Sequence, residues 1–378
     1  MIKLLPNKIL FILFFFITSS SFSQYYKLSN QAKISILTCG SGNELYSIYG
    51  HTAIRILDNY NNLDVVYNYG NFDFRVENFY AKFVKGDLQY FVAACSFQDF
   101  MAEYIESDRL VTEQILNLDE FQKQKLFDEL NTSMFSDERF YTYKFIDKNC
   151  TTMVLDKINA VYSCKIISKK TTLNQSYRTV LYKYVQNHFW ENFGINIIFG
   201  TKVDNPATKL FLPDELLQNI KTATFLGKPI AQKEVVLYKK TITTSYFSFW
   251  NSIYPYCIFL ILLLIINQKY IYLIYFSVLG LAGIFFSLVG FYSFHEEICN
   301  NYNVLLFNPS LLLLVYFTMR KNEKWTRNLC YFNIVCLVMY LLLLINKAHL
   351  IIMLPMITCS LIIFYRQQQI KILLPSIK

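Results

Sequence analysis

Charged residues are scarce in this chain. They make up 17% of its 378 residues, whereas 54% of the residues are hydrophobic. That balance excludes an ordinary soluble protein of this size and favours a membrane protein. The net charge of +9 is not spread evenly. Residues 24–248 hold 25 basic and 24 acidic side chains, whereas residues 249–378 hold 9 basic and 3 acidic side chains. The basic excess therefore flanks apolar runs, which indicates membrane topology and excludes a nucleic-acid-binding face.

Histidine is also rare, with four residues, and the nine cysteines form no CxxC pair or Cys/His cluster. This absence argues against zinc, and we predict neither a metal nor a cofactor. Four cysteines, Cys39, Cys95, Cys150 and Cys164, lie before the apolar C-terminal part, and their spacings show no disulfide framework. The polar run His295–Glu297 has no further potential ligand nearby in the sequence, so we interpret it as a solvated loop.

The first 23 residues have the pattern of a secretory signal. Lys3 and Lys8 precede the apolar run Ile9–Ile17, and a stretch of mostly small, polar residues ends at Ser23. The apolar run is shorter than the roughly 20 residues needed to span a bilayer. We therefore predict cleavage after Ser23, with an uncleaved anchor as the alternative. In both cases the segment that follows lies outside the cytoplasm.

Five apolar stretches near the C-terminus predict five membrane-spanning helices. The third is the least regular, because Asn308 and Pro309 interrupt its start and indicate a short or broken helix. If the preceding domain is exported, the outer loops carry Lys347 as their one basic residue, which agrees with the tendency of basic residues to stay inside. The predicted spans are residues 249–266, 270–292, 304–319, 328–346 and 349–365.

The region between these two ends alternates between strand-like and helical patterns. The turn-rich segment Asp58–Asp64 separates two strand-like runs and predicts a hairpin. This mixed order predicts an α+β fold with an antiparallel core, followed by an all-α membrane domain of five helices. We expect strands at residues 32–38, 51–57, 65–69, 88–94 and 110–116, and helices at 77–85, 97–107 and 119–133. The expected division is a signal peptide at 1–23, an exported domain at 24–245 and a transmembrane domain at 246–378.

Cys150 is the candidate nucleophile. Apolar residues recur at helical spacing over residues 153–158, so a helix is expected to begin near Asn149. A thiol in the first turn of a helix experiences the helix dipole and unpaired N–H groups, which favour the thiolate. A buried core cysteine gives the same local pattern. Cys39, in the glycine-bearing loop before residue 51, is the rival nucleophile, but no helix start follows it.

His51 is the candidate base. It follows Gly50 at the start of a predicted strand, and acyl transfer through a cysteine requires an imidazole within hydrogen-bonding reach of the thiol. Taken alone, a strand histidine is also consistent with a structural role. A third polar group should orient the ring. Asn68 on the neighbouring strand is best placed, and Asp73 and Glu44 are the alternatives.

Three further residues are candidates for substrate contact. Arg55 shares a strand face with His51, because residues four apart in a strand point the same way, and its guanidinium suits a phosphate head group. An ion-pair role for Arg55 remains open. Tyr49 and Asn149, which lie beside His51 and Cys150 in the sequence, complete the predicted set.

Several long segments occur together and in order: LTCGSGNELYSIYGHTAIRI, VVYNYGNFDF, ENFYAKFVKGDL, VTEQILNL and DKNCTT. In these segments, and in a later PATKLFLPDELL block, the sequence resembles the Lnb-type lipoprotein N-acyltransferases of bacterial envelopes over roughly residues 30–245. The apolar C-terminal part resembles the helical tail of that family. The family is in turn similar to the permuted papain-like enzymes of the NlpC and lecithin–retinol acyltransferase types, in which a strand histidine precedes a helix-initiating cysteine.

The resemblance implies a permuted papain-like (NlpC-like) domain in which Cys150 is the nucleophile and His51 the base. Asn68 stands where a histidine is more familiar. The implied reaction moves an acyl chain from a phospholipid, through a Cys150 thioester, to the α-amino group of the lipidated N-terminal cysteine of a lipoprotein. Multiple helical spans favour the inner membrane, with this domain in the periplasm. A membrane-anchored cysteine peptidase or amidase acting on cell-wall peptides, and a non-catalytic envelope scaffold, are the alternatives.

Overall fold

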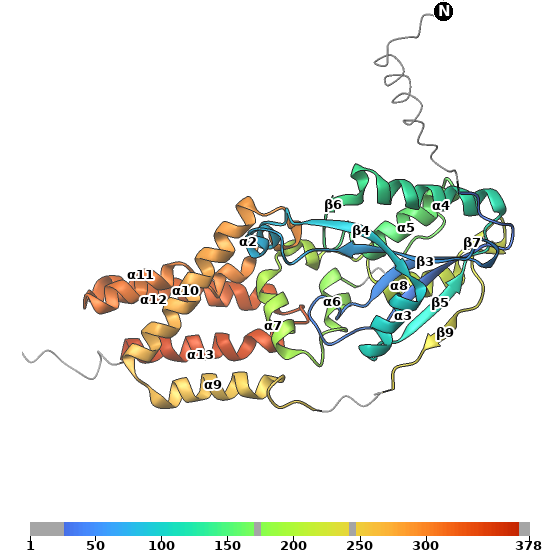
Figure 1. Cartoon of the computed structure of the whole chain (residues 1–378). Coiled ribbons are helices and arrows are strands. Elements are labelled where there is room, and N and C mark those ends of the chain that lie inside the picture. The colour runs from blue at the N-terminus through green and yellow to red at the C-terminus, as the bar shows by residue number, and fades with distance from the viewer. Residues whose placement is uncertain (1–25, 170–174, 242–246, 370–378) are drawn as a thin grey trace, which may run out of the picture.

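The computed structural model describes residues 26–169, 175–241 and 247–369. A sheet domain is followed by a helical bundle, and the two lie end to end (Figure 1). The predicted signal peptide at 1–23 lies outside the described residues, as does the predicted boundary at 245/246. The α+β class followed by a helical membrane part is confirmed.

The sheet has seven strands, and every neighbouring pair is antiparallel. Its spatial order is β6-β4-β3-β2-β1-β5-β9. The five predicted strands form its centre, and two unpredicted strands, β6 and β9, occupy the edges. In chain order the strands are β1 Lys33–Cys39, β2 His51–Asp58, β3 Leu63–Asn71, β4 Gln89–Ser96, β5 Val111–Ile115, β6 Phe140–Thr142 and β9 Val235–Tyr238; a separate hairpin joins β7 Thr224–Phe225 to β8 Lys228–Pro229.

Helices cover both faces of the sheet, because alternate residues of its central strands are apolar on each side. On one face, α3 (Phe97–Glu106) packs Phe100 and Tyr104 against β1 and β2. On the other face, α4 (Glu120–Phe135) and α5 (Cys150–Val161) enclose the larger core. The remaining helices of this domain are α2 Phe79–Lys85, α6 Tyr177–Tyr182, α7 Phe189–Ile198 and α8 Pro213–Thr222, with short 3₁₀ turns η1 Asn59–Asn61, η2 Asp137–Arg139 and η3 Thr201–Asp204.

Four helical segments of the bundle are long and apolar enough to cross a membrane: Lys269–Tyr292, Glu296–Met319, Glu323–Leu344 and Leu350–Gln368. A shorter apolar helix, Ile253–Ile266, precedes them. The third predicted span is broken as expected, since α11 begins directly after Asn308 and Pro309. The elements are α9 Ile253–Ile266, α10 Lys269–Tyr292, η4 Glu296–Ile298, η5 Tyr302–Leu305, α11 Ser310–Met319, α12 Glu323–Leu344 and α13 Leu350–Gln369.

The run His295–Glu297 joins the bundle to the sheet domain. Glu297 is buried, and its carboxylate accepts a hydrogen bond from the Ile146 N–H at 3.4 Å and lies 3.4 Å from Lys202 Nζ. Glu296 also pairs with Lys202, at 3.0 Å. The prediction of a solvated loop is therefore wrong for Glu297, whereas the Glu296 side chain is 54% exposed. Both carboxylates pair with lysines of the sheet domain, so this loop is attached to that domain.

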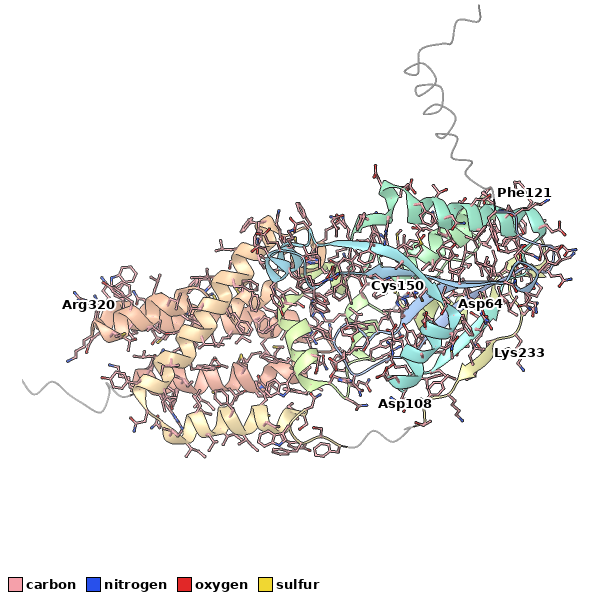
Figure 2. All side chains as sticks on the ribbon, viewed as in Figure 1. Asp64, Asp108, Phe121, Cys150, Lys233 and Arg320 are labelled. Carbon is pink, nitrogen blue, oxygen red and sulfur yellow. The ribbon has the colours of Figure 1, made fainter. Side chains whose placement is uncertain are left out.

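A second polar contact joins the same two parts. Arg178 is buried in α6, and its Nε donates to Asp204 Oδ1 at 2.7 Å. The second oxygen of Asp204 accepts from Lys347, in the loop between α12 and α13. Arg320, by contrast, lies at the far end of the bundle (Figure 2). The outer loops thus face the sheet domain, in agreement with the orientation predicted from the basic residues.

Candidate active site

Cys150 is the first residue of α5, and its position is set by the residue before it. Asn149 caps the helix: its Oδ1 accepts from the Thr152 N–H at 3.0 Å, and the Thr152 hydroxyl accepts from the Asn149 N–H at 2.8 Å. The Asn149 amide group also donates to the carbonyls of Phe145 and Phe211 at 2.8 and 2.9 Å. The side chain of Asn149 is therefore occupied within the protein. It positions Cys150, and this geometry gives no support to the predicted substrate contact.

His51 is placed by a tight turn at the start of β2. Gly50 has φ +81°, and a Cβ on it would lie 2.6 Å from the carbonyl oxygen of Cys39. Only glycine allows both that backbone conformation and that close approach. The turn starts β2 with His51 paired opposite Cys39 of β1. It leaves the imidazole at the sheet end nearest the start of α5.

The structure places the side chains of His51 and Cys150 close enough for each to shift the pKa of the other. Burial raises the pKa of the Cys150 thiol, but the positive charge and hydrogen bond of His51, with smaller contributions from the Thr52 backbone and the Thr151 hydroxyl, outweigh it and lower that pKa. Burial lowers the pKa of His51, but the Cys150 thiolate and the hydrogen bond with Asn68 raise it above the ordinary value. The lowered pKa of Cys150 and the raised pKa of His51 both favour a thiolate–imidazolium pair.

Asn68 contacts the imidazole of His51. Its Oδ1 lies 3.2 Å from His51 Nε2, and its Nδ2 donates to the sulfur of Cys95 at 3.5 Å. The Cys95 contact assigns the amide oxygen to the ring, so Nε2 carries a proton and Nδ1 is left for the thiol. The two alternatives lie elsewhere, since Asp73 pairs with an exposed arginine and Glu44 is exposed in a loop. Of the three candidates, Asn68 is the one that the fold places at the ring.

The rival nucleophile, Cys39, is completely buried in β1. Burial is the main reason that its pKa rises to about 12, against smaller lowering effects from Arg109 and Tyr104. A thiol with that pKa remains protonated at neutral pH and is a poor nucleophile. Cys150, in contrast, is partly exposed and has a lowered pKa. The electrostatic environment therefore favours Cys150 over Cys39.

Arg55 is not brought together with the pair. Its Nε and Nη2 donate to the two carboxylate oxygens of Asp64, both at 2.8 Å, and its Nη1 donates to Glu113 at 3.1 Å. The guanidinium also lies 3.3 Å from the ring centroid of Phe97. Asp64 pairs opposite Leu57 of β2, six residues along that strand from His51. Arg55 thus has the ion-pair role that was its alternative, and the predicted phosphate contact has no support in this geometry.

Tyr49 lies two residues before His51 and packs against aromatic rings. Its ring centroid is 5.3 Å from that of Phe145 and 5.8 Å from that of Tyr184. Its hydroxyl is buried and has no hydrogen-bond partner among the described residues. A buried polar group without a partner is costly in a folded protein. Tyr49 therefore remains a candidate for substrate contact.

Two threonines of the site were not predicted. Thr52 and Thr151 each follow a predicted reacting residue, and both are buried. Their hydroxyl oxygens lie 3.1 Å apart, which joins the start of β2 to the start of α5. The sequence contains a weak signal for them, since each threonine directly follows one of the two candidate reacting residues, His51 and Cys150. Nothing local in the sequence indicates that they meet.

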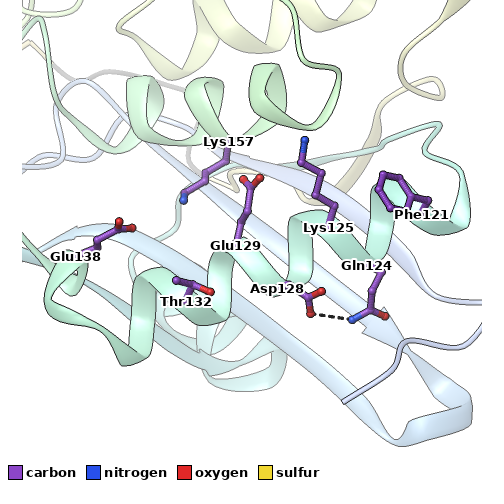
Figure 3. A pocket seen from close by; sticks show the side chains of 8 residues that line it. All are labelled: Phe121, Gln124, Lys125, Asp128, Glu129, Thr132, Glu138 and Lys157. Atoms are coloured by element: carbon purple, nitrogen blue, oxygen red, sulfur yellow. Dashed lines mark hydrogen bonds between the residues drawn. The ribbon is translucent and has the colours of Figure 1, made fainter. Parts of the chain in front are cut away.

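A cavity of about 380 Å³ lies on the outer surface of α4 and α5 (Figure 3). It contains none of the predicted site residues. Among the residues that the structure describes, no group of three or more His, Cys, Asp or Glu side chains could hold a metal ion. The cavity is lined by Phe121, Gln124, Lys125, Asp128, Glu129, Thr132, Glu138 and Lys157.

Comparison with known proteins identifies two family models in this chain. Residues 20–185 match the Lnb N-terminal periplasmic domain, and residues 267–373 match the Lnb transmembrane domain. No curated protein and no solved structure matches the chain significantly. The first match includes His51, Asn68 and Cys150, and the second includes α10, α11, α12 and α13.

Proposed function

This chain belongs to the Lnb family, and from that membership and the geometry around Cys150 we propose that it is a lipoprotein N-acyltransferase. Its acyl donor is a phospholipid and its acceptor is the α-amino group of the lipidated N-terminal cysteine of a lipoprotein. The observation that carries the proposal is the contact between Cys150 and His51, with Asn68 at 3.2 Å behind the ring. The enzyme acts from the periplasmic side of the inner membrane.

The first half-reaction acylates the enzyme. The Cys150 thiolate attacks an ester carbonyl of the phospholipid, a C–S bond forms, and the C–O bond to glycerol breaks. The imidazolium of His51 gives its proton to the departing glycerol oxygen, which leaves as the hydroxyl of a lysophospholipid. His51 is then neutral and Cys150 carries a thioester.

The second half-reaction transfers the chain to the lipoprotein. The α-amino nitrogen attacks the thioester carbonyl, a C–N bond forms, and the C–S bond breaks. Neutral His51 takes the proton of the amine, which restores the thiolate–imidazolium pair. Asn68 holds the ring in place through both steps, since its amide oxygen accepts a hydrogen bond from the Nε2–H group in either charge state of the ring.

Each half-reaction passes through a tetrahedral oxyanion at the carbonyl carbon. The first N–H groups of a helix have no partner within the helix. In α5 the side chain and carbonyl of Asn149 take the N–H groups of Thr152 and Met153. The N–H groups of Cys150 and Thr151 precede these and are the donors that we assign to the oxyanion.

The membrane part supports this choice of substrates. Both the phospholipid and the lipoprotein are held at the bilayer by acyl chains, so a catalytic domain fixed above the outer ends of the helices meets them at high effective concentration. Tyr49, with its buried unpaired hydroxyl, is the residue that we assign to substrate contact. The proposed chemistry uses side chains and backbone N–H groups of the protein, and we propose no cofactor.

The test is reconstitution of the full-length protein in phospholipid vesicles with a lipoprotein that has a free α-amino group. Mass spectrometry of the lipoprotein N-terminal peptide then measures acylation. We expect an added amide-linked acyl chain with the wild type and none with Cys150→Ser, whereas Cys39→Ser, at the buried rival cysteine, retains activity.

The alternatives give different results in the same experiment. A cell-wall peptidase or amidase leaves the lipoprotein unmodified and cleaves a peptidoglycan peptide in a Cys150-dependent way. A scaffold does neither, and its Cys150→Ser variant behaves as the wild type. Either result overturns the proposed function.

A further inference from the structure

The connection between β3 and β4 carries an exposed aromatic surface. Its helix, α2, has no buried residue, and Tyr80 is 79% exposed. Phe74, just before the helix, is 65% exposed, and Phe83 is also exposed. We propose that α2 and the aromatic residues before it insert into the outer leaflet of the bilayer and bring a phospholipid acyl chain to Cys150. The second part of this inference rests on the proposed function, whereas the first does not.

The end of α2 is attached to the outer end of α10 (Figure 1). The Phe294 N–H donates to the Lys85 carbonyl at 2.7 Å, and the Ser293 hydroxyl donates to the Val84 carbonyl at 2.9 Å. His295 Nε2 lies 2.8 Å from the carbonyl oxygen of Phe83, the residue before Val84. Three consecutive residues after the membrane helix thus hold three consecutive carbonyls at the end of α2.

This attachment fixes the height of α2 relative to the bilayer. With 24 residues, α10 is about 36 Å long, slightly more than the hydrocarbon thickness of about 30 Å, so its last turn lies at the interface. Phe291 in that turn is 89% exposed. Because α2 has seven residues and is about 10 Å long, all of it lies close to that interface. Aromatic side chains favour this depth.

The aromatic residues of α2 adjoin exposed aromatic residues at the outer end of α10, since the Phe83 ring centroid lies 6.2 Å from that of His295, next to Phe294. Phe291 and Tyr292 end the exposed side of α10, and Phe294 beside them is also exposed. Lys82, on α2, supplies a cation at the level of the lipid phosphates. Exposed aromatic residues on α2 and at the outer end of α10, with lysines beside them, fit the interface of a phospholipid leaflet.

The same connection leads directly to the candidate active site. Gly70, near the end of β3, lies beside α5: a Cβ on it would be 3.7 Å from the Cβ of Cys150. Phe72 follows two residues later, and its ring centroid is 4.9 Å from that of Phe74. Strand β3 also carries Asn68. Three residues therefore separate Gly70, beside the thiol, from the Phe74 ring, which we place at bilayer level.

Neighbouring rings extend this apolar surface into the sheet domain. Phe72 lies 5.2 Å from Tyr90, and Tyr90 stacks on Tyr143 at 4.4 Å. Phe72, Tyr143 and Cys150 all pack against the main core of the domain. An acyl chain that leaves the bilayer beside α2 meets aromatic surface along this path and little water, which lowers the cost of its transfer to the thiol.

Insertion is tested by tryptophan fluorescence, which requires no catalysis. In a background with Trp190, Trp250 and Trp325 replaced by Phe, Tyr80→Trp is compared with Tyr60→Trp. Tyr60 is a matched control, since it is also 79% exposed and also adjoins β3, but at the opposite end of the strand in η1. Both proteins are placed in vesicles of phospholipids brominated on the acyl chains, which quench nearby indoles.

We expect a blue-shifted emission and loss of fluorescence in brominated vesicles for Tyr80→Trp, and neither change for Tyr60→Trp. Equal, weak quenching at both positions overturns insertion. A blue shift at Tyr80→Trp that depends on protein concentration and not on bromination also overturns it, because the surface then binds a second copy of the chain.

Acyl delivery is tested with the triple variant Phe74→Ser, Tyr80→Ser and Phe83→Ser. We expect slower formation of the Cys150 thioester from vesicle phospholipid than in the wild type or in Tyr60→Ser. Alkylation of Cys150 by iodoacetamide reports whether the Cys150–His51 pair is intact in each variant. Unchanged thioester formation in the triple variant overturns delivery, whereas absence of a thioester in the wild type overturns the proposed function and leaves the fluorescence result standing.

Discussion

The hydroxyl oxygens of Thr52 and Thr151 lie 3.1 Å apart in the interior of the sheet domain, and each threonine directly follows a residue to which we assign a role in catalysis. This bond fixes the start of β2 against the start of α5. It therefore couples the stability of the domain to the geometry of the Cys150–His51 contact.

Replacing either threonine by the isosteric valine leaves the other hydroxyl buried without its partner. We expect Thr52→Val and Thr151→Val each to lower the free energy of unfolding by about 1–3 kcal/mol. The double variant is expected to lose less than the sum of the two, because it leaves no unpaired hydroxyl. Denaturant unfolding of the four proteins measures this coupling, and strictly additive losses would contradict it.

Cys150 is expected to react with iodoacetamide at lower pH than an ordinary thiol, whose pKa is about 9. The thiolate population rises as pH passes the pKa, so a lowered pKa moves the midpoint of alkylation to lower pH. His51→Ala removes the largest effect that lowers this pKa and leaves burial, so its midpoint shifts upward. Peptide-level mass spectrometry measures the rate at each cysteine.

Cys39 is the internal control in that experiment. Its pKa of about 12 and its complete burial predict no alkylation between neutral pH and pH 9 in the folded protein. Modification of Cys39 at the same pH as Cys150, or an unchanged midpoint in His51→Ala, would contradict the assignment of the ion pair.

Asn68→Ala is expected to slow thioester formation by at least about tenfold, because the imidazole loses the group that holds it against the thiol. Asn68→His, which supplies the residue more familiar at this position, is expected to retain more activity than Asn68→Ala. Asp73→Ala and Glu44→Ala remove the two alternatives and are expected to leave the rate unchanged. If Asp73→Ala or Glu44→Ala slowed thioester formation more than Asn68→Ala does, that carboxylate and not Asn68 would orient the imidazole.

Asp204→Asn breaks the contact between the sheet domain and the outer loop of the bundle. Because Arg178 is buried and loses its carboxylate partner, we expect the free energy of unfolding to fall by about 3 kcal/mol. Asp73→Asn is the matched control, since its Arg75 partner is 90% exposed, and it is expected to show no measurable change. An equal effect of both substitutions would contradict the role of the buried pair.

The same pair has a defined pH dependence. Burial raises the pKa of Asp204, but Arg178 and Lys347 outweigh it, so this pKa lies below the ordinary value of 3.8. The carboxylate then contributes its full stability above that value and loses it as pH falls through the lower pKa of the folded state. The difference in stability between wild type and Asp204→Asn is expected to be constant from about pH 5 to pH 8 and to shrink in stronger acid.

Local patterns were sufficient for much of the fold. The sequence of β1 alternates between polar and apolar residues at its start, β2 follows Gly50, and the cap at Asn149 is a property of adjacent residues, so these strands and the start of α5 could be predicted. The break before α11 was visible as Asn308 and Pro309. Each of these signals lies within one element, where spacing alone determines which face or which end a residue occupies.

Contacts between distant segments could not be read in the same way. Arg55 does share a strand face with His51, but Asp64 and Glu113 on neighbouring strands decide what its guanidinium binds. The loop at Glu297 looked solvated because its partner Lys202 lies 95 residues earlier. Such pairings depend on how whole elements pack, and one sequence contains no local sign of them.

Acyl transfer through Cys150 is tested most directly by the mass of the Cys150 peptide. The full-length protein is first incubated with vesicles of a phospholipid that carries an isotopically labelled acyl chain. We expect a labelled, hydroxylamine-sensitive acyl group on Cys150 that disappears when a lipoprotein with a free α-amino group is added. We expect no such adduct in His51→Ala. A Cys150 peptide of unmodified mass in the wild type before any lipoprotein is added, in a preparation that then acylates added lipoprotein, would contradict the thioester mechanism.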